Sequence, residues 1–381
     1  MESYLKAEVS SSAVAHNLEL LRGMTAPGVK LCAVVKADCY GHGLEVLLNP
    51  IAAHADCLAV ATPQEAVQLR DLGYERPVLA FFSPCAYAAG RELAAALEEL
   101  VARRITMTLT SEADLAPVAQ AAARVGATAE AHLKIDTGMG RSGAPADSAA
   151  ALIERIRATP GVKLTGAYTH LASADEADKS SAIGQLSRFV TAVGAGGGRR
   201  TETSKGLTLH AANSAAIIDL PQAHLDMVRA GIAMYGYQPS GQMRNRPPLR
   251  PLLRLTGPLM QVKTLPAGSA CGYGLTRTFD RDTRVGLVPV GYADGYFRCL
   301  SNKAAMRVGG REAPVLGRVS MDQTIIDLTA VPLAKVGDEV EILSDDPSAP
   351  NSVEGLAALA GTISYEITCR LGRRIRRVLI D

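Results

Sequence analysis

The chain has 381 residues, of which 48% are hydrophobic and 20% are charged, and this balance excludes a largely disordered protein. Its 40 Lys and Arg residues and 38 Asp and Glu residues leave a formal net charge of +2, which excludes a global positive field for gathering nucleic acid or an anionic membrane. No apolar run approaches the roughly 20 residues of a membrane span. The first residues lack the basic and apolar regions of a signal peptide, so we expect a cytoplasmic protein.

The seven cysteines are widely spaced, and no two of them form a C-x-x-C pair. An odd number without such pairs predicts neither a disulfide framework nor a structural zinc site. We therefore expect most of them to be small buried hydrophobic residues, and we expect no metal site.

Short apolar runs alternate with helical stretches over the first 240 residues. The runs are predicted as strands at 31–36, 58–61, 78–82, 105–109, 129–135, 164–170, 207–211 and 225–230. The clearest helices are predicted at 63–72, 88–102 and 112–125, the first with Thr62 as its cap and Pro63 as its first residue. Eight such repeats predict an α/β fold, a closed (β/α)8 TIM-like barrel, with a doubly wound open sheet as the alternative.

The pattern changes after Tyr237. A segment rich in Pro, Gly, Arg and Asn at 238–251 is typical of a linker. Short strands follow at 259–264, 284–290, 305–308, 313–317, 324–327 and 339–343, and a helix is predicted at 353–360. We therefore assign residues 1–240 to the barrel and residues 241–381 to a smaller, mostly β C-terminal domain.

Polar residues stand where several barrel strands end, which is where barrels place their chemistry. Lys36 closes the first strand, where desolvation would lower its pKa and free the amine to form an imine. The alternative is a lysine whose amine extends into solvent at the rim of the barrel. Arg229 and the amides of residues 231–232 form a candidate anion site. His210 could simply satisfy a buried hydrogen bond, and Asn213 could simply cap a helix. Their convergence on one face of the barrel favours a functional site.

Nine blocks of the sequence, in order from residue 34 to residue 374, resemble bacterial alanine racemases. They are VVKADCYGHG, HLKIDTGMGRSG, YTHLASAD, HAANSAA, VRAGIAMYG, CGYG, GYADGY, GRVSMDQ and GTISYEITCRLGRR. The resemblance implies an N-terminal (β/α)8 barrel, a C-terminal β domain and the cofactor pyridoxal 5′-phosphate (PLP). It also implies a head-to-tail homodimer whose active sites are shared between the two subunits.

The resemblance also implies the catalytic residues. Lys36 matches the lysine that holds PLP covalently and acts as the base on one face of the substrate Cα, and Tyr273 of the other subunit matches the base on the opposite face. A tyrosine with a pKa near 10 is a poor base at neutral pH, so its site must tune it. His170 and Arg229 match a hydrogen-bonded chain to the cofactor and the tyrosine. Arg229 matches the residue that faces the pyridine nitrogen, and because a guanidinium cannot accept a proton, we expect that nitrogen to stay unprotonated.

Further residues match binding and supporting positions. Those expected to bind the cofactor are Tyr40, Asn213, Ser214, Gly231, Ile232 and Tyr365, besides Lys36, His170 and Arg229. Arg141 and the partner chain's Met321 match residues that bind the substrate carboxylate. Tyr292 matches the lining of a narrow entry channel, with Asp322 in support. Lys134 matches a lysine that is often carbamylated, where the added negative charge holds Arg141 in place.

Two departures from the family pattern bear on substrate range, since Ala230 and Ser320 stand where many members have Phe and Cys. The first alternative is therefore a racemase for serine or a broader range of amino acids. A decarboxylase of the same architecture would place an acid at the pyridine nitrogen, which disagrees with Arg229. A PLP-binding regulatory protein would not need the second domain.

The five arginines within residues 370–377 suggest nucleic-acid binding, but a solvated strand edge or an interface suits a chain of net charge +2 better. The resulting prediction is a racemase that interconverts L- and D-alanine by two bases and supplies D-alanine for peptidoglycan. Its partners would be the small-molecule substrate and a second copy of the chain, with no nucleic acid and no membrane.

Overall fold

The computed structural model describes residues 4–86, 90–196 and 199–381. Between residues 30 and 230, parallel strands close into a barrel. Its strands are β2 (Lys30–Val34), β3 (Cys57–Val60), β4 (Val78–Ala80), β5 (Met107–Leu109), β6 (Ala129–Asp136), β8 (Val162–Tyr168), β11 (Thr208–His210) and β12 (Met227–Ala230). They pair as β12-β2-β3-β4 and β11-β8-β6-β5. A bridge between Leu79 and Thr106 joins β4 to β5, and the Asp226 N–H donates to Leu209 O at 3.0 Å beside β11 and β12. The predicted barrel is confirmed, and the open sheet is excluded.

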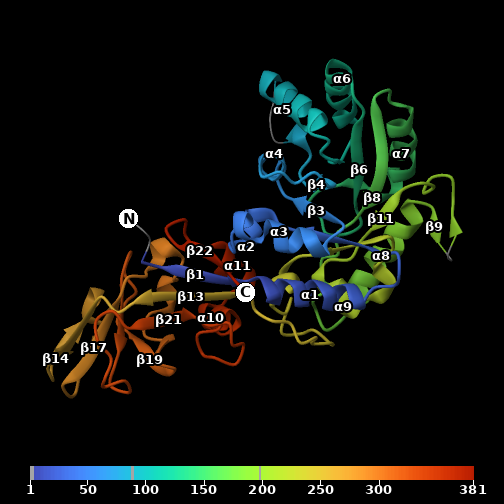
Figure 1. Ribbon diagram of the computed structural model, residues 1–381. Helices are drawn as coiled ribbons and strands as arrows, with labels where there is room; N and C mark the ends of the chain where they lie inside the picture. The colour runs from blue at the N-terminus through green and yellow to red at the C-terminus, as the bar shows by residue number, and fades with distance from the viewer. Residues whose placement is uncertain (1–3, 87–89, 197–198) are drawn as a thin grey trace.

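Helices cover the outside of the barrel (Figure 1). They are α1 (Ser11–Gly23), α3 (Leu44–His54), α4 (Pro63–Asp71), α5 (Gly90–Ala102), α6 (Leu115–Val125), α7 (Ala149–Ala158), α8 (Ser180–Ala192) and α9 (Ser214–Asp219). The start of α4 shows why they form where the sequence predicts. Thr62 Oγ1 accepts from the Glu65 N–H at 3.2 Å, and the Glu65 carboxylate accepts from the Thr62 N–H at 3.0 Å, a capping box. The predicted helix 88–102 is described from Gly90, and residues 88 and 89 lie outside the described residues.

A second sheet of nine strands is formed in the part of the chain that the structure describes, in the order β14-β17-β20-β19-β18-β21-β13-β1-β22. The strands are β14 (Gln261–Leu265), β17 (Thr283–Val288), β20 (Thr324–Asp327), β19 (Arg311–Leu316), β18 (Ala305–Val308), β21 (Glu339–Leu343), β13 (Leu253–Pro258), β1 (Lys6–Ser10) and β22 (Arg376–Ile380). Beside it lie α10 (Val353–Ala360) and α11 (Ser364–Cys369). The remaining short strands are β7 (Ala144–Pro145), β9 (Ala195–Gly196), β10 (Arg199–Arg200), β15 (Ala270–Cys271) and β16 (Arg277–Thr278).

The strand β1 belongs to this second sheet, although it precedes the barrel in the sequence. It pairs antiparallel with β13, with Lys6 opposite Thr256, and parallel with β22, with Lys6 opposite Arg376. Figure 1 shows β1 in blue among the orange and red strands. The domain boundary near residue 240 stays a prediction, and β1 is an element that we did not predict. The arginine-rich 370–377 segment ends in β22, which lies at the edge of the sheet.

The short helix α2 (Lys36–Tyr40) belongs to the barrel and packs against the second domain. It follows β2 and lies against α11. A Cβ on Gly41 would come within 1.9 Å of the Thr368 carbonyl oxygen, so this approach requires glycine. Within the described residues, no helix is both long enough and apolar enough to cross a membrane.

Candidate active site

Lys36 lies two residues beyond Val34, the last residue of the barrel strand β2. Its side chain is largely withdrawn from solvent, and burial lowers the pKa of the amine, with the nearby positive charge of Arg141 lowering it further. A larger fraction of this amine is therefore neutral than of an ordinary lysine. Only the neutral amine is a nucleophile or a base, so the position suits the predicted role of Lys36.

The four residues after Lys36 form a left-handed turn. Residues 37–40 have φ between 53° and 55°, and none of them is glycine. Each such residue costs about 1–2 kcal/mol relative to a right-handed conformation, so the surroundings must hold the turn in place. The Ala37 N–H donates to Glu65 Oε1 at 2.7 Å, and the Leu44 N–H donates to Asp38 Oδ1 at 2.6 Å. Arg377 of β22 donates to the Gly41 carbonyl oxygen at 3.0 Å.

Hydroxyl and amide groups gather beside this turn. Ser214 Oγ accepts from the Gly231 N–H at 2.9 Å, and Ile232 opens the next turn, Ile232–Tyr235. A Cβ on Gly231 would lie 2.8 Å from Tyr40 Oη, and the Tyr365 ring centroid lies 6.0 Å from that of Tyr40. Burial raises the pKa of Tyr40 and of Tyr365, so both phenols keep their proton and can donate it in a hydrogen bond. Such a donor set suits a phosphate.

Arg229 lies on β12 in the barrel interior and is 3% exposed. Its guanidinium donates to Thr169 O at 2.8 Å and to Ala211 O at 3.1 Å, and Nη2 lies 3.4 Å from His170 Nδ1. Its Cζ sits 5.4 Å from the Tyr168 ring centroid. Burial lowers the pKa of Arg229 to about 10, which leaves it charged at neutral pH. Burial, followed by this charge, also lowers the pKa of His170 well below its usual range.

The hydrogen bonds of Arg229 also determine the tautomers of two buried histidines. Arg229 Nη1 lies 2.9 Å from His210 Nδ1, and a guanidinium can only donate, so His210 Nδ1 accepts and its Nε2 carries the hydrogen. That Nε2 donates to His132 Nδ1 at 2.9 Å. Burial lowers the pKa of His132 to about 3, so it stays neutral. His210 therefore has the satisfied buried hydrogen bonds that we considered possible.

Lys134 and Arg141 add positive charge near Lys36. Lys134 is 8% exposed on β6, and its Nζ donates to Ser142 Oγ. Burial, followed by the charges of Arg141 and Arg229, lowers the pKa of Lys134 to about 8. Arg141 lies in the exposed loop after β6. Together with Arg229, these cations suit a ligand that carries a phosphate and a carboxylate.

Besides Tyr365, four predicted site residues lie in the second domain. Tyr273 begins a short turn and is 70% exposed, while Met321 and Tyr292 are 54% and 44% exposed. The Tyr292 N–H donates to Ser320 O at 3.1 Å, and this hydrogen bond joins the segment that carries Tyr292 to the one that carries Met321. Asp322 forms an ion pair with Arg374 at 2.8 Å. In the barrel, Asn213 caps α9, where its side chain accepts from the Ala216 N–H at 3.1 Å.

Comparison with known proteins decides the family. The N-terminal domain model of alanine racemase matches residues 9–239, and the C-terminal domain model matches residues 252–379. The chain belongs to the alanine racemase family. It is therefore an amino-acid racemase, an isomerase.

Relatives and solved structures agree over the full length of the chain. An alanine racemase of Desulfovibrio desulfuricans is 40% identical over 98% of this chain and 98% of its own. The alanine racemase structure from Clostridium difficile 630 is 31% identical, with a TM-score of 0.90 over 100% of this chain and 96% of its own. That from Bacillus anthracis with bound L-Ala-P is 27% identical, with a TM-score of 0.85 over 100% of this chain and 96% of its own.

Sequence reasoning on this racemase missed three residues that support the site. Glu65 holds the left-handed turn, His132 completes the histidine pair, and Arg377 ties β22 to Gly41. The Thr-x-x-Glu pattern at Thr62 identifies Glu65 as a cap, but its contact with Ala37 depends on two neighbouring βα units. The other two contacts join residues far apart in the sequence, so no local signal marks them.

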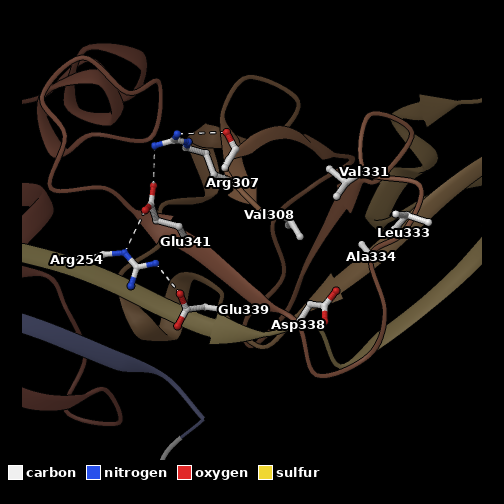
Figure 2. Close-up of a pocket in the computed structure, with 11 residues that line it drawn as sticks. Arg254, Arg307, Val308, Val331, Leu333, Ala334, Asp338, Glu339 and Glu341 are labelled. Carbon is white, nitrogen blue, oxygen red and sulfur yellow. Dashed lines mark hydrogen bonds and ion pairs between the residues drawn. The ribbon is translucent and has the colours of Figure 1, made fainter.

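A hollow of about 450 Å³ lies in the second domain of the racemase, away from Lys36 (Figure 2). Arg254 donates there to Glu8 at 2.9 Å, to Glu339 at 2.6 Å and to Glu341 at 3.1 Å. Burial alone would raise the pKa of Glu341, but the hydrogen bond from Arg254 holds it below its usual range. These ion pairs link β1, β13 and β21, so the charged residues of the hollow hold strands of the second sheet together.

Proposed function

We propose that this racemase interconverts L-alanine and D-alanine with PLP as its cofactor. The observation that carries the proposal is Lys36, a lysine of lowered pKa that follows β2, the strand paired with β12, on which the buried Arg229 lies. The relatives are named alanine racemases, and the Bacillus anthracis structure holds bound L-Ala-P.

The residues present fit PLP in chemistry and in placement. The hydroxyls of Tyr40, Ser214 and Tyr365 and the backbone at Gly231 and Ile232 would hold the phosphate dianion, and the Cβ that Gly231 lacks would fill this cradle. Lys36 would hold the cofactor covalently, and Arg229 would face the ring nitrogen. When bound, PLP supplies an electron sink that makes the substrate Cα–H acidic enough to be removed.

Racemisation requires a base on each face of Cα. The Lys36 amine takes or returns the proton on one face, since its lowered pKa leaves more of it neutral. Tyr273 of a second subunit would act on the opposite face, because in its own chain it projects from the second domain and is 70% exposed. Arg141 and the partner chain's Met321 would position the substrate carboxylate.

The exposed side chains of Tyr273, Tyr292 and Met321 support a homodimer with shared active sites. Large apolar and aromatic side chains grouped on one domain indicate an interaction surface. The product D-alanine would enter peptidoglycan synthesis.

The test is enantiomer-resolved interconversion of alanine by the purified protein with PLP, in both directions. The Lys36→Ala variant should lose racemisation, whereas Lys163→Ala, which removes an exposed lysine of β8, should match the unmodified protein. A protein that binds PLP but racemises serine or other amino acids faster than alanine would overturn the assigned substrate and favour the broader-specificity racemase.

A further inference from the structure

Three sulfur-bearing side chains meet inside the barrel, at the end opposite Lys36. Cys57 and Met227 are the first residues of β3 and β12, and Cys32 is the third residue of β2. Cys32 and Cys57 stand directly opposite each other in the β2–β3 pairing, which places their side chains side by side on one face of the sheet. The Cys57 thiol donates to Met227 Sδ at 3.6 Å. We call these three residues the sulfur cluster.

The strand register places the sulfur cluster on the interior face of the barrel. Cys32 is paired with Arg229 across β2 and β12, and Met227 lies two residues before Arg229 on the same strand. Residues that are paired, or two apart on a strand, share a face of the sheet. Arg229 points into the barrel, because it contacts His210 and Tyr168 of other strands. All three sulfurs therefore face inward, below Arg229.

A buried hydroxyl beside the sulfur cluster has no partner. Tyr74 is 6% exposed, and among the described residues its Oη finds no hydrogen-bond partner. Burial raises the pKa of this phenol, and Cys57 and Cys32 lie close enough to raise it further. Buried polar atoms are nearly always satisfied, so an unpaired hydroxyl beside two thiols is a sign of a missing ligand.

We propose that the sulfur cluster binds one Cu(I) ion in each chain. Two thiolates and a thioether form the soft, three-coordinate sulfur set that Cu(I) accepts, whereas zinc requires four ligands. On binding, the thiols of Cys32 and Cys57 lose two protons to solvent, two Cu–S bonds form to the thiolates and one to Met227 Sδ, and no electron is transferred. The bound group has a net charge of −1, which the guanidinium of Arg229 opposite Cys32 offsets.

This site differs in type from those that our sequence analysis considered. The two cysteines are 25 residues apart in the sequence and the third ligand is a methionine, so no zinc-like spacing marks the cluster. Among the described residues, no group of three His, Cys, Asp or Glu side chains could hold a metal ion. Burial and the neighbouring thiol raise the pKa of Cys32, which disfavours thiolate attack and thus a disulfide between the pair.

As the route to the sulfur cluster we propose a surface hollow at the same end of the barrel. A hollow of about 600 Å³ is lined there by Lys30, Thr208 and Asp226, the last of which precedes Met227. Cys57 is itself only partly buried. A metal site needs such a path, and this one does not pass through the Lys36 site.

The test is a competition for Cu(I) between the reduced holoenzyme and the coloured Cu(I)–bicinchoninate complex, under anaerobic conditions. The holoenzyme should withdraw one Cu(I) per chain. Removing a group that only orients a metal ligand weakens metal binding by about 10–100-fold. Cys57 would itself be a ligand, so Cys57→Ser should weaken Cu(I) binding by more than about 100-fold. Met227→Leu conserves volume and should weaken it by about 10-fold. Cys299→Ser and Cys369→Ser, which alter exposed thiols, should bind as the unmodified protein does.

Circular dichroism and thermal unfolding would establish that each variant is folded. If Cys57→Ser does not fold, the Met227→Leu variant tests the copper site in its place. X-ray absorption at the copper edge should show three sulfur neighbours and no nitrogen. The proposal is overturned if the holoenzyme withdraws no copper, if the Cys299 or Cys369 variants lose binding, or if the Cys57 and Met227 variants bind as tightly as the unmodified protein.

Discussion

The single residues of the site show how burial shifts nitrogen bases toward their neutral form. Lys36, His170 and Lys134 all have a lowered pKa, and in each case the largest cause is burial. Positive neighbours then act in the same direction. A base that is neutral near physiological pH can take a proton or form a covalent bond, which an ordinary lysine cannot do efficiently.

Lys134 provides a test of this arrangement through its expected carbamylation. Carbon dioxide adds only to a neutral amine, and burial lowers the pKa of Lys134 to about 8. The carbamylated fraction should therefore rise as the pH increases from about 7 to about 9, well below the range of an ordinary lysine. Carbon-13 NMR with labelled bicarbonate would measure the carbamate signal, with Lys134→Ala as the control that removes it. A signal that stays unchanged over this range would contradict the lowered pKa.

The sequence revealed the site residues better than it revealed their partners. Lys36 and Arg229 could be singled out because each ends an apolar strand. The contact between His210 and His132 could not, since β11 and β6 are separated in the sequence and come together only when both pair with β8. The unpaired hydroxyl of Tyr74 likewise becomes visible only in three dimensions.

Among the elements, the left-handed turn at residues 37–40 depends most on its neighbours. The carboxylate of Glu65 accepts from the N–H groups of Ala37, Ala61 and Thr62, and so connects the turn to the start of α4. Glu65→Ala leaves these donors without their acceptor and should lower the free energy of unfolding by about 1–3 kcal/mol. It should also weaken retention of PLP, because the turn places Lys36 and Tyr40.

Urea unfolding and equilibrium dialysis of PLP would measure the two effects of Glu65→Ala. The matched control is Glu45→Ala, which removes an exposed glutamate from the first turn of α3. If Glu65→Ala destabilises the protein but retains PLP as the control does, Glu65 acts only as a helix cap and does not position the turn.

The elements themselves were predicted where they carry a local pattern. The barrel strands and the strands from 259 to 343 form close to their predicted positions, because each is an apolar run between turn residues. The strands β1, β13 and β22 were not predicted. Their pairing joins residues near 6, 256 and 376, and no pattern within a short window reports such a contact. The left-handed turn was missed because residues 37–40 include no glycine.

The whole molecule should be active only as a pair of chains. If Lys36 and Tyr273 come from different subunits, a mixture of Lys36→Ala and Tyr273→Phe proteins forms heterodimers with one intact site and one doubly altered site. Equal amounts, refolded together, should recover about a quarter of the unmodified activity, since half of the dimers are mixed and each has one working site of two.

The control for this complementation is each variant refolded alone, which should stay inactive. Size-exclusion chromatography would establish that the mixed sample is dimeric. If the mixed sample is dimeric but no more active than the separate variants, both bases belong to one chain and the shared site is wrong.

The membership of β1 in the second sheet has a consequence for synthesis on the ribosome. β1 leaves the ribosome before the barrel does, but its partners β13 and β22 follow only after more than 240 further residues. The barrel strands, which pair mostly with their neighbours in the sequence, can form in the meantime. The strand β1 therefore waits unpaired throughout barrel folding, and β22 completes its pairing.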